Sequence, residues 1–139
     1  MCAGSPPGRY NNRYRDHAQQ GVVHLEALDL AKQIVDLSSE KQASDILMLD
    51  IREVSLLADY FVICSAGSER QITAIRDDLV GGLRDTAHRR PLRAQGTASS
   101  GWVLLDYGDV IVHIFSPEER EFYQLEELWA EAPAVVRIQ

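Results

Sequence analysis

The sequence has no apolar run that approaches the roughly 20 consecutive residues of a membrane-spanning helix. Its first residues also lack the charged and then apolar order of a secretion signal. Only two cysteines are present, Cys2 near the start and Cys64 within an apolar segment, and two are too few for a disulfide framework. We therefore expect a cytoplasmic protein without a membrane segment.

Basic residues are the minority charge, because Lys and Arg number 14 against 21 Asp and Glu, for a net charge of -7. A general nucleic-acid-binding protein would have the opposite balance, since phosphates attract basic surfaces. The balance instead favours a partner with a basic surface, or no charged partner. The length of 139 residues fits one domain that can bury a sizeable core.

Three parts of the chain differ in composition. Residues 1–20 contain Gly, Pro, Asn, Arg, Gln and Tyr without an apolar period, which predicts a disordered N-terminal extension. Residues 21–132 carry the apolar patterns of a folded domain. Residues 133–139 are expected to be a C-terminal tail.

The apolar patterns predict an α/β (α+β) fold, with a mixed β-sheet of about five strands flanked by helices. One helix is expected from Val23 to about Leu37, where apolar residues recur every three or four positions. A second is expected up to about Arg89, with Ser68 and Gln71 as its capping box. The second and fifth strands are strongly apolar, which favours central positions. The expected strands are Asp45–Ile51, Asp59–Ala66, Pro91–Gly96, Trp102–Tyr107 and Val110–Phe115.

The C-terminal third predicts a hairpin followed by a capped acidic helix. Gly108-Asp109 joins the last two strands and suits a tight turn. Ser116 and Pro117 supply the N-cap and first-turn proline of the helix. The glutamates of this segment indicate a solvated face, or one that meets a basic partner. Its buried stripe is expected to consist of Phe122, Leu125, Leu128 and Trp129.

No set of residues predicts an active site. The Gly67-Ser68 turn at a helix start could hold a phosphate, and a Gly-Ser turn also begins the nucleotidyltransferase signature. That chemistry needs paired carboxylates for Mg²⁺ on a neighbouring strand, and none follows. His113 and Cys64 lack the setting of an activated nucleophile. We therefore expect no catalytic residue and no cofactor.

The hairpin carries the strongest candidate for a binding surface. Trp102 starts a strand after a polar turn, with Asp106 on the same face by alternation and Tyr107 on the other. An aromatic residue beside a carboxylate suits an interface hot spot that faces Arg or Lys, and a core position for Trp102 is an equally weighted alternative. Asp106 and Asp109 flank the turn, which fits turn chemistry better than a metal site.

The basic residues of the domain gather around one predicted helix end. They could contact RNA phosphates, but a solvated helix terminus favoured by the helix dipole is the simpler interpretation. The cluster consists of Arg84, His88, Arg89, Arg90 and Arg93.

Three ordered blocks resemble the ribosomal silencing factor (Iojap-related) family over about residues 25–130. The blocks are ADYFVICSAGSERQ at Ala58–Gln71, GWVLLDYGDVIVHIF at Gly101–Phe115, and R-x-F-Y-x-L-E-x-L-W from Arg120 to Trp129. Their shared order and compatible spacing make the resemblance far more specific than any one block alone.

The resemblance implies a nucleotidyltransferase-like fold without the catalytic acids, and hence a protein that is not an enzyme. It further implies binding to the large ribosomal subunit through ribosomal protein L fourteen, which blocks small-subunit joining and lowers translation when nutrients are scarce. By motif position, Trp102, Asp106 and Tyr107 are expected to contact that protein. Homodimerisation of the free protein, a minor contact with ribosomal RNA, and a nucleotide-binding enzyme as the alternative function stay open.

Overall fold

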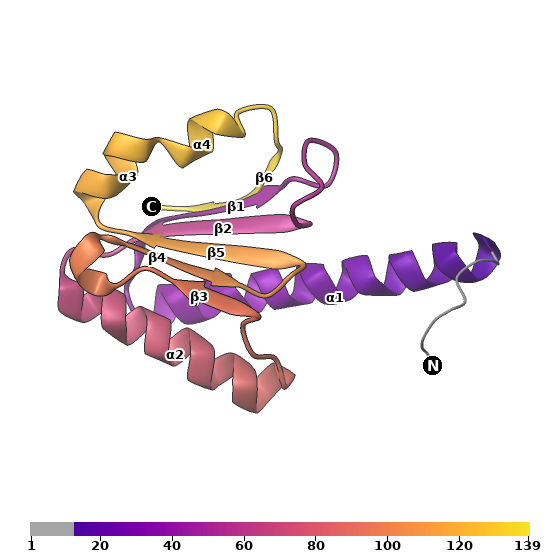
Figure 1. The fold of residues 1–139 in the computed structure, drawn as a ribbon, viewed down its shortest axis with the longest axis horizontal. Helices are drawn as coiled ribbons and strands as arrows, with labels where there is room; N and C mark the ends of the chain where they lie inside the picture. The colour runs from indigo at the N-terminus through magenta and orange to yellow at the C-terminus, as the bar shows by residue number, and fades with distance from the viewer. Residues whose placement is uncertain (1–12) are drawn as a thin grey trace.

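Residues 13–139 are described by the computed structural model, and they form a six-stranded mixed β-sheet between helices. Helices α1 and α2 cover one face, and the shorter α3 and α4 lie over the other (Figure 1). No helix within these residues is both long and apolar enough to cross a bilayer. The elements are α1 (Arg13–Glu40), β1 (Ser44–Asp50), β2 (Tyr60–Ser65), α2 (Glu69–Ala87), β3 (Arg93–Gln95), the short 3-10 helix η1 (Ala98–Ser100), β4 (Trp102–Asp106), β5 (Val110–Phe115), α3 (Pro117–Tyr123), α4 (Leu125–Leu128) and β6 (Ala134–Ile138).

The strands lie in the order β3-β4-β5-β2-β1-β6. The two central strands, β2 and β5, run parallel, with Tyr60 opposite Val110 and Ser65 opposite Phe115. Every other neighbouring pair in this sheet is antiparallel. Because all residues of β2 are buried, its continuous apolar sequence matches its position. The predicted mixed sheet and the central placement of the second and fifth strands are therefore confirmed.

Two boundaries differ from the sequence prediction. The expected tail contains β6, which pairs with β1 and raises the number of strands from about five to six. β6 is mostly exposed, although four of its five residues are apolar, and the prediction of a tail overlooked this strand-like sequence. At the other end α1 already begins at Arg13, inside the stretch expected to be disordered. The first 12 residues of that stretch lie outside the described residues.

The start of α2 shows how the local sequence fixes a helix. The Ser68 hydroxyl accepts a hydrogen bond from the Gln71 backbone N–H at 3.1 Å, and the Gln71 side chain accepts one from the Gly67 N–H at 2.8 Å. The predicted cap is thus confirmed with one change, since Gln71 reaches Gly67 rather than Ser68. The buried side of the helix packs with α1 and the sheet through Ile72, Ile75, Leu79 and Leu83.

The helical segment over the other sheet face is broken into two pieces. Gln124 adopts a left-handed conformation, with φ of 46°, and separates α3 from α4. Leu125 and Trp129 pack against the sheet core. The predicted buried stripe is wrong for Phe122 and Leu128, which are 77% and 72% exposed. The break at Gln124 explains the error, because residues on either side no longer share one helical period.

We expect alanine substitutions at two glycines to have opposite effects on stability. Gly96 has φ of 85°, and a Cβ there would overlap the backbone carbonyl oxygen of Trp102. Gly96→Ala should therefore lower the free energy of unfolding by about 2 kcal/mol. Gly81 lies inside α2, and its Cβ would approach nothing closer than 3.7 Å. Gly81→Ala should raise the stability by about 1 kcal/mol. Urea denaturation measures both changes in the free energy of unfolding. Changes of the same sign in the two variants would contradict the different roles of the two glycines.

Candidate protein-binding site

Alternation along β4 builds the candidate surface. Trp102, Leu104 and Asp106 are half-buried and share one side of the strand, whereas the residues between them are buried on the other. That other side faces the core formed with α1 and α2, where Tyr107 also lies. The predicted facing of Trp102 and Asp106, opposite to Tyr107, is therefore confirmed.

Trp102 is held by aromatic contacts on the α3 side of the sheet. Its ring stacks on Phe115 with centroids 4.9 Å apart and lies 4.6 Å from the Tyr123 ring. The indole Nε1 donates a hydrogen bond to Nδ1 of His113 at 3.2 Å. Because the indole is nevertheless only half-buried, Trp102 combines the two interpretations left open by the sequence: one part packs and another faces outward.

An open hollow of about 320 Å³ lies beside Trp102. Leu104 and Tyr123 contribute to it, and neither was identified as a site residue from the sequence. Alternation from Trp102 could have identified Leu104, whereas the position of Tyr123 depends on how α3 folds back over the sheet. The hollow is lined by Gln95, Gly96, Ser100, Trp102, Leu104 and Tyr123.

Asp106 has a structural role as well as a position on this surface. Its Oδ1 accepts a hydrogen bond from the Gly108 backbone N–H at 2.8 Å, which closes the hairpin turn. Its Oδ2 lies 3.6 Å from the Arg93 guanidinium, a long ion pair with an arginine that is largely exposed. The turn hydrogen bond therefore accounts for Oδ1 of Asp106. The ion pair of Oδ2 with Arg93 is long enough to be exchanged for one with a basic group of a partner protein.

Tyr107 is 2% exposed, so its side chain does not reach the surface in this structure. Burial raises the pKa of Tyr107 to about 12. The hydroxyl makes no hydrogen bond within the described residues. Its backbone carbonyl accepts a hydrogen bond from Arg89 at 2.8 Å, which connects the hairpin to the end of α2. Tyr107 thus positions the hairpin from the core side.

His113 is the buried neighbour of the site, with only 4% exposure. Burial lowers the pKa of His113 to about 4, so the imidazole is neutral at pH 7. A neutral ring can accept the Trp102 hydrogen bond at Nδ1 and then carries its proton on Nε2. His113 therefore helps to orient the indole and shows no catalytic arrangement.

The burial of His113 predicts a pH dependence of stability. Between pH 6.5 and about 4 the unfolded chain binds a proton at His113 and the folded protein does not. The free energy of unfolding should therefore decrease as the pH falls through this window, by up to about 1.4 kcal/mol per pH unit from this group. Urea denaturation of the wild type and His113→Asn measures the contribution, and the variant should show a shallower slope. If the free energy of unfolding changed equally with pH in both proteins, His113 would not be the source of the pH dependence.

Arg120 fixes α3 relative to the sheet. Its side chain is 12% exposed, and it pairs with Glu126 of α4 at 2.8 Å. Nη1 donates to the carbonyl oxygen of Asp45 at 2.6 Å and to the hydroxyl of Ser65 at 2.9 Å. One guanidinium thus joins both short helices to the ends of β1 and β2, and so determines where Tyr123 lies beside Trp102.

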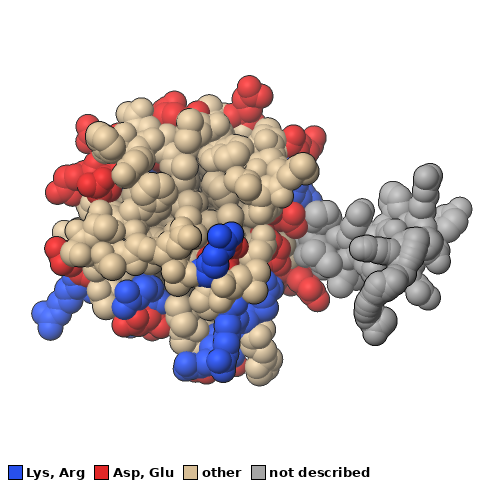
Figure 2. Space-filling model, in the orientation of Figure 1, with Lys and Arg blue, Asp and Glu red and all other residues tan. Residues whose placement is uncertain are grey.

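Basic side chains gather near the C-terminal end of α2, whereas acidic ones line the margin around α3 and α4 (Figure 2). Arg89 is part of the fold, since it pairs with Asp109 at 2.8 Å. Arg84 pairs with the adjacent Asp85 through largely exposed side chains. His88 forms the C-cap of α2 in a left-handed conformation. The predicted basic cluster is therefore partly structural and partly solvent-exposed.

The alternative phosphate site is a closed helix cap. The Gly67 and Gln71 backbone N–H groups already donate to side chains of the same turn. Among residues 26–139, whose side chains the structure describes, no group of three or more His, Cys, Asp or Glu could hold a metal ion. The turn thus has a complete structural explanation.

Comparison with known proteins identifies relatives of this chain. The family model described as "Ribosomal silencing factor during starvation" matches residues 24–139. A ribosomal silencing factor of Halalkalibacterium halodurans is 40% identical over 117 residues, which cover 82% of this chain and 94% of the relative. The chloroplastic protein Iojap of Zea mays is 36% identical over 135 residues, covering 96% of this chain and 54% of the maize protein.

Solved structures share the fold. A crystal structure from Bacillus halodurans has a TM-score of 0.67 at 35% identity and covers 78% of this chain and 98% of its own. Another from Chromobacterium violaceum has a TM-score of 0.71 at 28% identity, with coverage of 74% and 85%. The family match includes the whole sheet and the hairpin that carries Trp102. The chain therefore belongs to the ribosomal silencing factor family.

Proposed function

We propose that the protein binds the large ribosomal subunit through ribosomal protein L fourteen and thereby prevents the small subunit from joining. Its membership of a family of ribosome regulators, which are not enzymes, supports this function. The structural observation that carries it is Trp102, a half-buried indole beside an open hollow on a molecule of net charge -7. This combination suits a basic protein partner, and ribosomal proteins are commonly basic.

The three predicted contact residues have different parts in this proposal. Trp102 is the anchor, because a large aromatic side chain gains most when a partner covers its remaining exposed area. Asp106 offers a carboxylate whose pairing with Arg93, at 3.6 Å, can be exchanged for a basic group of the partner. Tyr107 supports the hairpin from the buried side. It contributes to binding indirectly, because it holds the surface that contains Trp102 and Asp106 in shape.

Silencing by this route needs only steric exclusion. The bound protein and the small subunit require overlapping surface on the large subunit, so only one of them can occupy it. The fraction of silenced subunits then depends on the concentration of the protein relative to its dissociation constant. The reduction in translation follows from occupancy without a chemical step.

Finer parts of the proposal concern location and secondary contacts. We place the protein in the cytoplasm, although the maize relative is named as chloroplastic.

The free protein can form a homodimer through the hollow beside Trp102. Contacts with ribosomal RNA would use the exposed Arg84, Arg90 and Arg93 rather than Arg89, which is paired within the fold.

Co-sedimentation with separated ribosomal subunits in sucrose gradients, followed by a subunit-joining assay, tests the proposal. We expect the protein to travel with the large subunit alone and to reduce the yield of joined ribosomes. Sedimentation of the isolated protein at several concentrations tests the homodimer. Binding to neither subunit, or binding without an effect on joining, would contradict the proposed function.

A further inference from the structure

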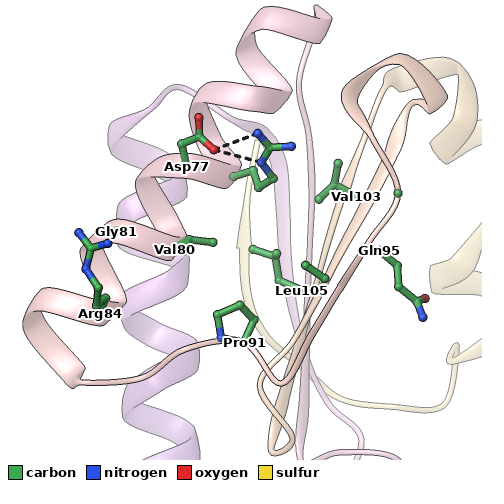
Figure 3. A pocket seen from close by; sticks show the side chains of 11 residues that line it. Asp77, Val80, Gly81, Arg84, Pro91, Gln95, Val103 and Leu105 are labelled. Carbon is green, nitrogen blue, oxygen red and sulfur yellow. Dashed lines mark hydrogen bonds and ion pairs between the residues drawn. The ribbon is translucent and has the colours of Figure 1, made fainter.

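A second concavity lies between α2 and the edge of the sheet, on the opposite side of β4 from Trp102. This α2–β3 groove has a volume of about 520 Å³, which is within the range of ligand-binding pockets. Figure 3 looks into it, with α2 on one side and the strands on the other. The side chains that matter most are Arg76, Val80, Arg84, Pro91, Val103 and Leu105.

The groove has an apolar floor and a rim that carries two arginines. Val80, Val103 and Leu105 supply the floor. Arg76 and Arg84 stand on the rim, each beside the aspartate that follows it in α2. Within the part of the chain whose side chains are described, the two arginines pair only with neighbouring aspartates that are largely exposed. Such pairs contribute little to stability, so acidic groups of a ligand can replace them.

The sheet edge beside the groove can accept another strand. Among the strands of residues 13–139, β3 occupies the end of the sheet and pairs with β4 alone. All three residues of β3 are exposed, and Ala94 lines the groove. Addition of an extended peptide to such an edge gives main-chain hydrogen bonds, and alternate side chains then enter the adjacent pocket. The geometry of this edge therefore favours a peptide ligand.

Gly81 provides an independent indication that the groove is kept open. Glycine inside a helix costs about 1 kcal/mol relative to alanine. Packing explains Gly82, because its Cβ would lie 3.2 Å from a methyl carbon of Leu37. Packing does not explain Gly81, which lines the groove and whose Cβ would approach only the Arg84 guanidinium, at 3.7 Å. The missing side chain leaves space in the wall for a ligand.

We propose that the α2–β3 groove binds an extended acidic peptide segment of a partner protein, which pairs with β3. Its apolar side chains lie on the floor, and its carboxylates pair with Arg76 and Arg84. A nucleic acid fits less well, because none of the described residues that line the groove is aromatic and could stack on a base. The groove shares Gln95 and Gly96 with the hollow beside Trp102, but it lies on the α2 side of β4 and the proposed contact of Trp102 with L fourteen does not use it, so the inference goes beyond the proposed function.

Selection of short random peptides displayed on phage against the full chain tests this inference. We expect enriched peptides that alternate acidic and apolar residues and that shift the amide NMR signals of Arg93–Gln95. Gly81→Leu should weaken their binding at least about tenfold by filling the groove. Peptides that bind Gly81→Leu equally well, or an absence of acidic enrichment, would overturn the proposal. So would binding of a mixed-sequence single-stranded RNA that Gly81→Leu abolishes while no peptide is enriched.

Matched variants separate this groove from folding and from the ribosome-binding surface. Gly81→Leu improves helix propensity, so a loss of binding does not reflect a loss of α2. Ala74→Leu adds a similar side chain at an exposed position of α2 that does not line the groove, and it should leave the peptide affinity unchanged. Trp102→Ala should retain peptide binding, and Gly81→Leu should retain co-sedimentation with large subunits. Failure of one proposal is therefore distinguishable from failure of the other.

Discussion

Replacing Trp102 with alanine is expected to weaken binding to large ribosomal subunits at least about thirtyfold, a loss of about 2 kcal/mol. The indole is the largest side chain of the candidate surface, and it stacks on Phe115 beside the open hollow. Truncation removes both the contact area and the wall of that hollow. Quantitative co-sedimentation over a range of protein concentrations gives the two dissociation constants.

The same substitution also removes packing within the protein, so folding has to be measured beside binding. Loss of the contacts to Phe115 and Tyr123 should lower the stability without unfolding the sheet, because the pairing of β2 with β5 at its centre does not include Trp102. Leu56→Ala is the matched control, because Leu56 is a fully exposed apolar residue in the loop between β1 and β2. A folded Trp102→Ala protein with wild-type affinity would exclude Trp102 as the anchor.

Replacing Arg120 with methionine should lower the free energy of unfolding by about 3 kcal/mol. Methionine retains much of the apolar length but loses the bonds to Glu126, the Asp45 carbonyl and the Ser65 hydroxyl. These partly buried oxygen atoms then lose the hydrogen-bond donor that Arg120 supplied. Urea denaturation gives the loss in stability, and hydrogen exchange should show faster opening of α3 and α4 than of the sheet.

Two comparisons test whether the location of Arg120 causes this effect. Arg52→Met breaks an exposed ion pair with Asp50 at 2.7 Å and should cost less than about 1 kcal/mol. Combining Arg120→Met with Glu126→Gln should cost less than the sum of the two single changes, because the residues form one pair. Similar losses for Arg52→Met and Arg120→Met, or full additivity, would show that Arg120 does not anchor the helices.

The main sheet was predictable from the sequence because its strands are apolar and its turns carry specific residues. The continuous apolar run in β2 predicted its buried central position. The cap at Ser68 and the Ser116-Pro117 start of α3 are local signals, and both are present in the structure. β6 was missed although Val135, Val136 and Ile138 favour a strand, because its pairing with β1 joins segments that lie far apart in the chain.

The candidate site was only partly predictable for a similar reason. Alternation along one strand placed Trp102 and Asp106 on a common face. The hydrogen bond from Trp102 to His113 depends on the pairing of β4 with β5, and the position of Tyr123 depends on Arg120 and the end of α3 at Gln124. These relations join residues far apart in the chain or depend on a left-handed residue that the sequence pattern does not mark. Local periodicity therefore identifies the strand but not its neighbours.

The pairing of β1 with β6 has a consequence for how the protein folds during its own synthesis. β1 is made early, yet one of its edges is covered only by β6, which follows every other strand in the chain. The central strand β2 likewise waits for β5, its parallel neighbour. Such long-range pairing slows folding, and an uncovered apolar strand is prone to associate with other chains. In a nascent chain of this protein, one edge of β1 therefore stays uncovered until residues 134–138 have been synthesised, and the chain can associate with other chains during that interval.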